Sequence, residues 1–406
     1  MKNNAIQRRS DALQKSTPRA IPLVLALSFL LFITNPFDSL EDEFVRYDAD
    51  SMPSHYIAAN ITIYIYGGVH ENDSIFRTNT LQRFGTGRFA YSVHDMASTC
   101  DNNSCNNRLD AQMNDITVDD YSSSSSPCLA ISKHYGPRFG YCHHDALRCS
   151  HPQCKTMIEG DEMCKVANFD ARQYYSADIP NSGYLPLGPR LDSWSALQLL
   201  QKSPEFFMKP PSSRRYAFNA IFSMVTSKGR RYLANQLNRT SVYNVTLPMY
   251  TSISGRWASM TEVDAVDTGI ENKLNPLSYT EVLLDSIFTL SPAGHNPECF
   301  RMFEAVEAGS IPVLVKDDLY ATTYAGGACL EPLQHWRDAP ILVLDSWDDL
   351  YPTVVRLLGD LEALHKMQRD LGEWYEGYMR KIVRDFEDFL MTPIDSSVQA
   401  NQTHAL

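Results

Sequence analysis

Several features that mark common protein classes are missing from this sequence. It lacks an excess of basic residues, since 36 lysines and arginines stand against 48 aspartates and glutamates and give a formal net charge of −12. That acidic balance argues against a nucleic-acid-binding protein. The sequence after the N-terminus also has no basic stripe that could follow a phosphate backbone. The chain also lacks a glycine-dense Walker or dinucleotide-binding loop. It has no Cys-x-x-Cys pair of the kind found in structural zinc sites. A nucleotide can still bind, because only the local potential at its phosphates matters.

A long apolar run is missing as well. The uncharged apolar stretch from Ala20 to Thr34 is shorter than the roughly 20 residues that a typical membrane-spanning helix needs. Basic residues precede it and acidic residues follow it (Lys2, Arg8, Arg9, Lys15 and Arg19; Asp38, Glu41, Asp42 and Glu43). The positive-inside rule then places the N-terminus in the cytosol and the rest across the membrane. We expect a single-pass signal-anchor; a cleaved signal peptide is the alternative, although no small-x-small pair follows the run.

The cysteines are clustered. Seven of the nine lie between Cys100 and Cys164, and only Cys299 and Cys329 lie downstream. Behind a membrane anchor, such a cluster in loop-rich sequence is typical of disulfides. Zinc binding by Cys142, Cys149, Cys154 and nearby histidines is the alternative. The odd total leaves at least one thiol unpaired, and we expect it to be Cys299.

The chain is long enough for two domains of ordinary size. We expect a basic cytosolic tail, the anchor, a stem, an N-terminal acceptor lobe with cysteine-rich loops, a C-terminal donor lobe and a disordered tail (residues 1–19, 20–34, 35–56, 57–205, 206–390 and 391–406). Ile57 to Tyr66 alternates β-branched and other residues, which predicts the first strand of the N-terminal lobe. Ser278-x-x-Glu281 fits a capping box that opens a helix. Residues 350–390 are expected to be largely helical.

The most informative segment is Ile287 to Val315. It predicts a strand, a Gly/Pro/Asn loop, an amphipathic helix ended by Gly309 and a second strand. The loop lies at the carboxyl end of the first strand and leads into a helix N-terminus, where backbone N–H groups and the helix dipole favour anions. Arg301 and Glu304 fall on one face of the helix. An arginine can neutralise a diphosphate and a carboxylate can accept ribose hydroxyls, which suggests a uridine-type sugar nucleotide. A solvated surface pair is the alternative.

The run Ala293-Gly-x-Asn-x-Glu-x-x-Arg-x-x-Glu-Ala, followed by Gly309-Ser-Ile-Pro-Val, resembles the signature of exostosin-like glycosyltransferases. Within that family it is most similar to the ribitol xylosyltransferase branch. Further similarity lies in the segments Tyr184–Arg190, Arg214–Ile221 and Tyr279–Leu284. The resemblance covers roughly residues 183–350, and no family motif is found upstream.

The resemblance implies an α/β fold of the GT-B type, with two Rossmann-like lobes and the nucleotide-sugar site in the C-terminal lobe. It implies an inverting Golgi enzyme, anchored as a type II membrane protein, that transfers xylose from UDP-xylose to a ribitol-phosphate-type glycan on a glycoprotein. Other glycosyltransferases are candidate partners. No cofactor and no metal are expected, because the single Asp-x-Asp triplet, Asp48-Ala-Asp50, lies in the predicted stem.

The resemblance also supplies the candidate site. Positive charge for the leaving diphosphate must then come from arginines and backbone N–H groups, with Arg301 foremost. The full set expected to bind the UDP-sugar is Ser291, Gly294, Asn296, Arg301, Glu304, Arg190 and Arg230. Retaining enzymes with two glutamates eight residues apart would need a glutamate where Asn296 stands. For the general base that inversion needs, Asp192 is our candidate, with His94 and Asp95 as alternatives.

Two other functions remain open from the sequence. One is a catalytically silent lumenal relative that binds glycans or supports a transferase partner. The other is a zinc-dependent lumenal hydrolase that uses the cysteine and histidine cluster.

Overall fold

The computed structural model of the chain describes a little more than half of its residues. They are 59–66, 80–95, 128–133, 155–159, 171–172, 175, 183–237, 247–254, 274–294, 296–320, 331 and 333–392. The predicted anchor, the stem and most of the cysteine-rich region lie outside them. No helix in the described part of the chain combines the length and the apolar character that crossing a bilayer requires. Among the described side chains, Cys299 carries a free thiol, as predicted.

The first sheet is formed by residues 59–172. Its strands stand in the order β2 (Phe89–Asp95), β1 (Ala59–Tyr66), β3 (Cys128–Lys133), β4 (Lys155–Glu159) and β5 (Ala171–Arg172). Every neighbouring pair is parallel. The alternating segment predicted as the first strand is β1, and Ile61 and Ile63 on it are buried.

The second sheet is formed by residues 216–344. Its strands stand in the order β10 (Leu342–Leu344), β9 (Ile311–Val315), β8 (Ser286–Leu290), β6 (Tyr216–Ser223) and β7 (Met249–Ser254). All of its neighbouring pairs are parallel too. Every residue of β8 and β9 is buried, as expected for central strands of a parallel sheet covered on both faces. The predicted α/β class is therefore confirmed.

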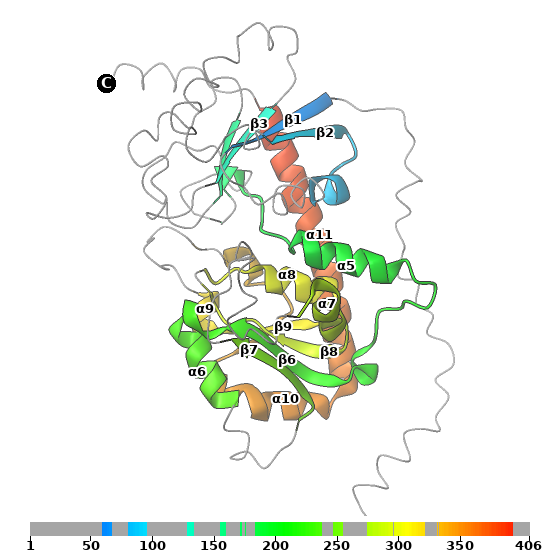
Figure 1. Cartoon of the computed structure of the whole chain (residues 1–406), viewed down its shortest axis with the longest axis vertical. Coiled ribbons are helices and arrows are strands. Elements are labelled where there is room, and N and C mark those ends of the chain that lie inside the picture. The colour runs from blue at the N-terminus through cyan, green and yellow to red at the C-terminus, as the bar shows by residue number, and fades with distance from the viewer. Residues whose placement is uncertain are drawn as a thin grey trace, which may run out of the picture. The chain divides into compact units, whose positions relative to one another are not determined.

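Helices accompany the strands in the described residues, and a further helical segment covers residues 80–84. They are α5 (Leu191–Gln201), α6 (Lys228–Leu237), α7 (Pro276–Leu284), α8 (Phe300–Glu307), α9 (Lys316–Leu319), α10 (Leu350–Leu358) and α11 (Leu361–Met391). Figure 1 shows α7 and α8 on one face of the second sheet and α6 and α10 on the other. The predicted helix over residues 350–390 is found as two helices, because Asp360 begins α11 by accepting the backbone N–H of Ala363 at 3.0 Å.

The start of α7 differs from the prediction. Ser278 does not begin a capping box; the helix starts earlier, at Pro276, with Asn275 as its N-cap. The Asn275 side chain accepts the Ser278 backbone N–H at 2.8 Å. Asparagine is a preferred N-cap and proline suits the first helical position, so these two neighbours outweigh the Ser-x-x-Glu pattern.

The end of α8 agrees with the prediction. Gly309 follows the helix with φ of +65°, the left-handed conformation that glycine adopts without strain. Its position is also crowded, since a Cβ there would come within 2.7 Å of Arg214 Nη2. A glycine is thus required at this turn for two reasons.

Arg214 joins several chain segments beneath this turn. Its guanidinium donates to four backbone carbonyl oxygens, those of Lys209 (2.9 Å), Leu283 (3.2 Å), Ser286 (2.8 Å) and Ala308 (3.0 Å). Burial lowers the pKa of Arg214 to about 10, with Asp285 opposing the shift. The side chain thus holds the ends of α7 and α8 against the start of β8.

The last turns of α11 contact the region of the first sheet. Glu387 is fully buried and accepts the Thr86 backbone N–H at 3.0 Å and the Tyr91 phenol O–H at 2.6 Å. A Cβ at Gly85 would come within 2.5 Å of Glu387 Oε1, so the turn can approach this carboxylate only because residue 85 is glycine. Tyr91 lies on β2, which means that α11 packs on the first sheet.

Candidate nucleotide-sugar site

The strand order places a ligand site at one edge of the second sheet. The chain passes from β6 outward to β7 on one side, and then returns to β8 on the other side of β6. In doubly wound sheets with this order, ligands bind outside the carboxyl ends of the two strands where the direction changes. Here those strands are β6 and β8. The loops that follow them contain residues 224–227 and 291–299, which include much of the predicted site.

The loop after β8 is held in place by the loop after β6. Ser227 Oγ donates to the Ala293 carbonyl at 2.7 Å, and Arg230 Nε donates to the carbonyls of Pro292 (3.2 Å) and Ala293 (3.1 Å). The backbone N–H of Ala293 in turn donates to Asp318 Oδ2 at 3.2 Å. Arg230 is buried and supports this loop, while a direct contact between Arg230 and a phosphate stays a prediction.

Within this loop, Gly294 has no room for a side chain, because a Cβ would lie 2.8 Å from Arg230 Nη2. Ser291 is buried and turned toward its own strand, where its Oγ donates to the Thr289 carbonyl at 3.4 Å. Asn296 is buried as well, and its Oδ1 accepts the Glu298 backbone N–H at 3.3 Å. In the described structure the Asn296 Nδ2 has no hydrogen-bond partner.

Glu304 is brought together with Arg190 and with Tyr279 of α7. Its side chain is 4% exposed, and Oε1 accepts Arg190 Nε at 3.2 Å while Oε2 accepts the Tyr279 phenol O–H at 2.6 Å. Burial alone would lower the pKa of Arg190, but the carboxylates of Glu304 and Asp192 outweigh it and raise that pKa. Arg190 therefore lies beside Glu304 of the predicted site, and its contact with the UDP-sugar stays a prediction.

Arg301 differs from the other arginines at the site. Its side chain is partly buried, and within the described residues its Nε and Nη1 are buried without any hydrogen-bond partner. Its positive charge acts on the neighbouring Tyr279, where it opposes the rise in the phenol pKa caused mainly by burial and by Glu304. A buried donor without a partner costs free energy, about 1–3 kcal/mol or more for a charged group. A bound anion would supply the missing acceptor.

Asp192 lies in the first turn of α5. Its Oδ1 accepts the Ser193 backbone N–H at 2.8 Å and lies 3.4 Å from Arg190 Nε. It is thus near the Arg190–Glu304 pair, and its role as general base stays a prediction. His94 and Asp95 end strand β2, and their side chains lie outside the described part of the chain.

Glu298 belongs to the quoted signature run but was not among the predicted site residues. It is 1% exposed, and its Oε1 accepts the Tyr184 phenol at 3.0 Å and the Trp336 indole N–H at 3.3 Å. Its Oε2 has no partner in the described structure. Burial raises the pKa of this carboxyl to about 8, although both hydrogen bonds act in the opposite direction. Glu298 is therefore a neutral acid at pH 7.

We expect Glu298→Gln to change how stability depends on pH. The folded-state pKa lies above the ordinary value of 4.5, so the unfolded chain ionises first and the wild type loses stability as the pH rises from about 4.5 to about 8. Each unit of difference between the folded and unfolded pKa changes the free energy of unfolding by about 1.4 kcal/mol. Glutamine cannot ionise and can still accept both hydrogen bonds. In urea unfolding, the variant should match the wild type near pH 4.5 and exceed it at pH 8.

The matched control is Glu373→Gln, which replaces an exposed carboxyl on α11. It should follow the wild type at both pH values. A Glu298→Gln variant that is less stable than the wild type at pH 8 would show that the ionised carboxylate is needed.

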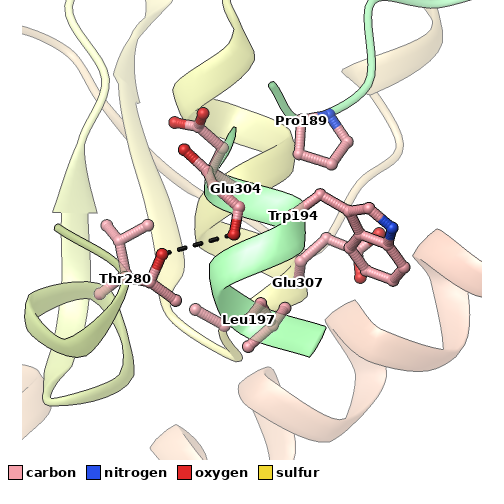
Figure 2. Close-up of a pocket in the computed structure, with 9 residues that line it drawn as sticks. Pro189, Trp194, Leu197, Thr280, Glu304 and Glu307 are labelled. Carbon is pink, nitrogen blue, oxygen red and sulfur yellow. Dashed lines mark hydrogen bonds between the residues drawn. The ribbon is translucent and has the colours of Figure 1, made fainter. Parts of the chain in front are cut away.

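A small pocket lies beside the Glu304 cluster, between α5, α7 and α8 (Figure 2). Its walls are mainly apolar, and the carboxylate-bearing residues Glu304 and Glu307 also line it. The Thr280 hydroxyl donates to the Ser193 carbonyl at 3.4 Å and so links α7 to α5. Glu307 accepts Arg83 Nη1 at 2.6 Å and the Tyr375 phenol at 2.9 Å. Both carboxylates therefore already have partners.

Comparison with known proteins covers the part of the site formed by the loop after β8 and by α8, whereas Arg190 and Asp192 precede the matched residues. Residues 205–393 match the family model described as RXYLT1 C-terminal domain. Over 120 residues the chain is 33% identical to ribitol-5-phosphate xylosyltransferase 1 of Homo sapiens and 31% identical to that of Mus musculus; each match covers 28% of this chain and 26% of the relative. The chain thus matches about a quarter of the length of these curated relatives. The predicted similarity to ribitol xylosyltransferases is confirmed for this segment.

Solved structures of two glycosyltransferases show a weaker likeness. The glycotransferase of kitacinnamycin gives a TM-score of 0.37 at 12% identity, over 82% of this chain and 99% of that one. The calicheamicin glycosyltransferase CalG4 gives 0.32 at 11% identity, over 80% and 99%. The α/β fold class rests on the sheet topology itself.

Proposed function

We propose that this protein is a glycosyltransferase that uses a nucleotide-sugar donor. The observation that carries the proposal is Arg301, whose buried Nε and Nη1 have no partner in the described structure. It stands one turn from Glu304, next to the edge of the sheet where ligands bind in this topology. The segment that holds both residues is the one similar to ribitol-5-phosphate xylosyltransferase 1. We therefore propose UDP-xylose as the donor and a ribitol-phosphate-type glycan on a glycoprotein as the acceptor.

Each group then has a chemical role. Arg301, at the start of α8, receives the diphosphate, whose negative charge grows as the sugar departs. Groups that stabilise a developing charge are most effective when their positions are fixed before the reaction. Ser227 and Arg230 hold the loop that leads into α8, and so help to fix this part of the site. Glu304 accepts a ribose hydroxyl. Asp192, which stands beside Arg190, is proposed as the general base.

The wider proposal is a GT-B enzyme that inverts the anomeric centre. It is supported by two parallel sheets with the same strand order, one for each expected Rossmann-like lobe. The donor would bind at the second sheet, and the acceptor would approach from the first. We also propose a Golgi location with the predicted anchor at residues 20–34, and leaving-group stabilisation by arginine and backbone groups without a metal.

Calorimetry with the full-length protein tests the proposal. UDP should bind, UDP-xylose should bind more tightly than other UDP-sugars, and hydrolysis or transfer of xylose should persist in EDTA. No binding of UDP would reject both the site and the function. Binding without turnover would favour a catalytically silent relative. Loss of activity in EDTA with recovery on adding zinc would favour the zinc-dependent alternative.

A further inference from the structure

We propose that Tyr279 is a positioning residue that makes the site selective for ribonucleotides over 2′-deoxyribonucleotides. This inference rests on the proposed function and concerns the sugar next to the base. Tyr279 donates its phenol O–H to Glu304 Oε2 at 2.6 Å and so fixes the carboxylate that is expected to accept the ribose. The two residues are 7% and 5% exposed, respectively.

The position of the Tyr279 side chain is fixed by the residues that surround it. The Tyr279 ring belongs to an apolar cluster with Trp194, Leu283 and Leu284. The Arg190 guanidinium carbon lies 5.9 Å from the ring centre. Because the ring is held by α7 and by this cluster, its hydroxyl can reach Glu304 from one direction only.

The two oxygens of Glu304 are not equally available. Oε1 receives two donors from Arg190, its Nε at 3.2 Å and its backbone N–H at 3.4 Å. Among the described residues, Oε2 receives one donor, the Tyr279 O–H. A carboxylate oxygen has two lone-pair directions, so Oε2 keeps one for a ribose hydroxyl. Burial and the neighbouring carboxylate raise the pKa of Tyr279 well above its ordinary value, so the phenol remains a donor over the whole working pH range.

The phenol also keeps Arg190 from taking both oxygens. A guanidinium commonly binds a carboxylate through two parallel hydrogen bonds. Without the Tyr279 hydroxyl, Oε2 would be free to turn toward Arg190, and its remaining lone pair would no longer face the ligand. Tyr279 thus preserves the acceptor that distinguishes a ribose from a deoxyribose.

The test is calorimetry of the full-length protein with UDP and with 2′-deoxy-UDP. A hydrogen bond to a charged group corresponds to about a 10- to 100-fold difference in affinity, so the wild type should prefer UDP by about that factor. In Tyr279→Phe the affinity for UDP should fall about 10-fold or more, whereas the affinity for 2′-deoxy-UDP should change less than about threefold. The preference for UDP should then nearly disappear.

Tyr375→Phe is the matched control. Tyr375 donates its phenol to Glu307, which lies three residues after Glu304 on the same helix. This variant removes the same kind of bond and should keep the wild-type preference for UDP. Thermal unfolding of both variants checks that the ring packing survives.

The outcomes separate the two proposals. If the wild type does not bind UDP, the proposed function fails. If UDP binds and Tyr279→Phe weakens both nucleotides equally, or neither, the role of Tyr279 is overturned while the proposed function stands.

Discussion

Replacing Arg301 with methionine is expected to abolish measurable UDP binding and to leave the fold intact. The Arg301 Nε and Nη1 have no partner in the described structure, so the variant breaks no hydrogen bond of these two atoms and removes two buried, unpaired donors. The free energy of unfolding should therefore stay the same or rise. Affinity for UDP should fall by a factor on the order of 100 or more, because charge-assisted bonds to the diphosphate are lost. Calorimetry and urea unfolding on the same preparation measure both effects.

Arg231→Met is the control for this experiment. Arg231 is an exposed arginine on α6, so its replacement changes the net charge equally without touching the site. It should leave UDP affinity within about a factor of two, the range expected for a surface charge change. If Arg301→Met unfolds the protein, Arg301 has a structural role. If the variant binds UDP as tightly as the wild type, the diphosphate lies elsewhere.

Unlike Arg301→Met, the variant Arg214→Met should lose a large part of its free energy of unfolding. This buried guanidinium donates to three backbone carbonyls at the ends of α7 and α8 and the start of β8, and to a fourth at Lys209. Methionine fills similar space but leaves these acceptors unpaired in the core, and each buried unpaired group costs about 1–3 kcal/mol. Allowing for partial rearrangement, we expect a loss of about 3–5 kcal/mol, a large fraction of the roughly 5–15 kcal/mol by which folded proteins are usually stable.

The neighbouring residue gives the control. Arg215 is paired with Asp285, but its side chain is 65% exposed. Asp285 is buried but keeps its ion pair with Lys209, and Arg215 itself is exposed, so Arg215→Met should have a small effect, about 1 kcal/mol or less, in the same urea titration. Equal losses for the two variants would mean that removal of positive charge, and not the four carbonyl contacts, explains the effect of Arg214.

The sequence predicted most accurately those structural elements that depend on residues close together in the chain. The unit from Ile287 to Val315 was predicted correctly because buried parallel strands are continuous apolar runs and because Gly309 ends a helix for a local reason. The start of α7 was predicted wrongly, since Asn275-Pro276 and Ser278-x-x-Glu281 are both valid local signals and only the structure decides between them.

The site was less accessible to the sequence because its key contacts are not local. The bond from Tyr184 to Glu298 joins residues 114 positions apart, and the bond from Trp336 joins residues 38 positions apart. Nothing near Glu298 in the sequence indicates a neutral acid. Similarly, the run Lys228-Gly-Arg-Arg231 shows three cations, and only the fold reveals that Arg230 turns inward to support the loop while Arg231 remains exposed.

The contact of Glu387 with Thr86 and Tyr91 has a practical consequence for chimeric enzymes. Residues 205–393 match one family model, which invites a cut near residue 205 and an exchange of the two halves between relatives. However, the last turns of α11 contact the region of the first sheet through Glu387. The carboxylate fits there because Gly85 has no side chain. A cut near residue 205 would therefore separate the end of α11 from the residues of the first half that it contacts. A functional chimera should take the final turns of α11 from the same parent as residues 80–95.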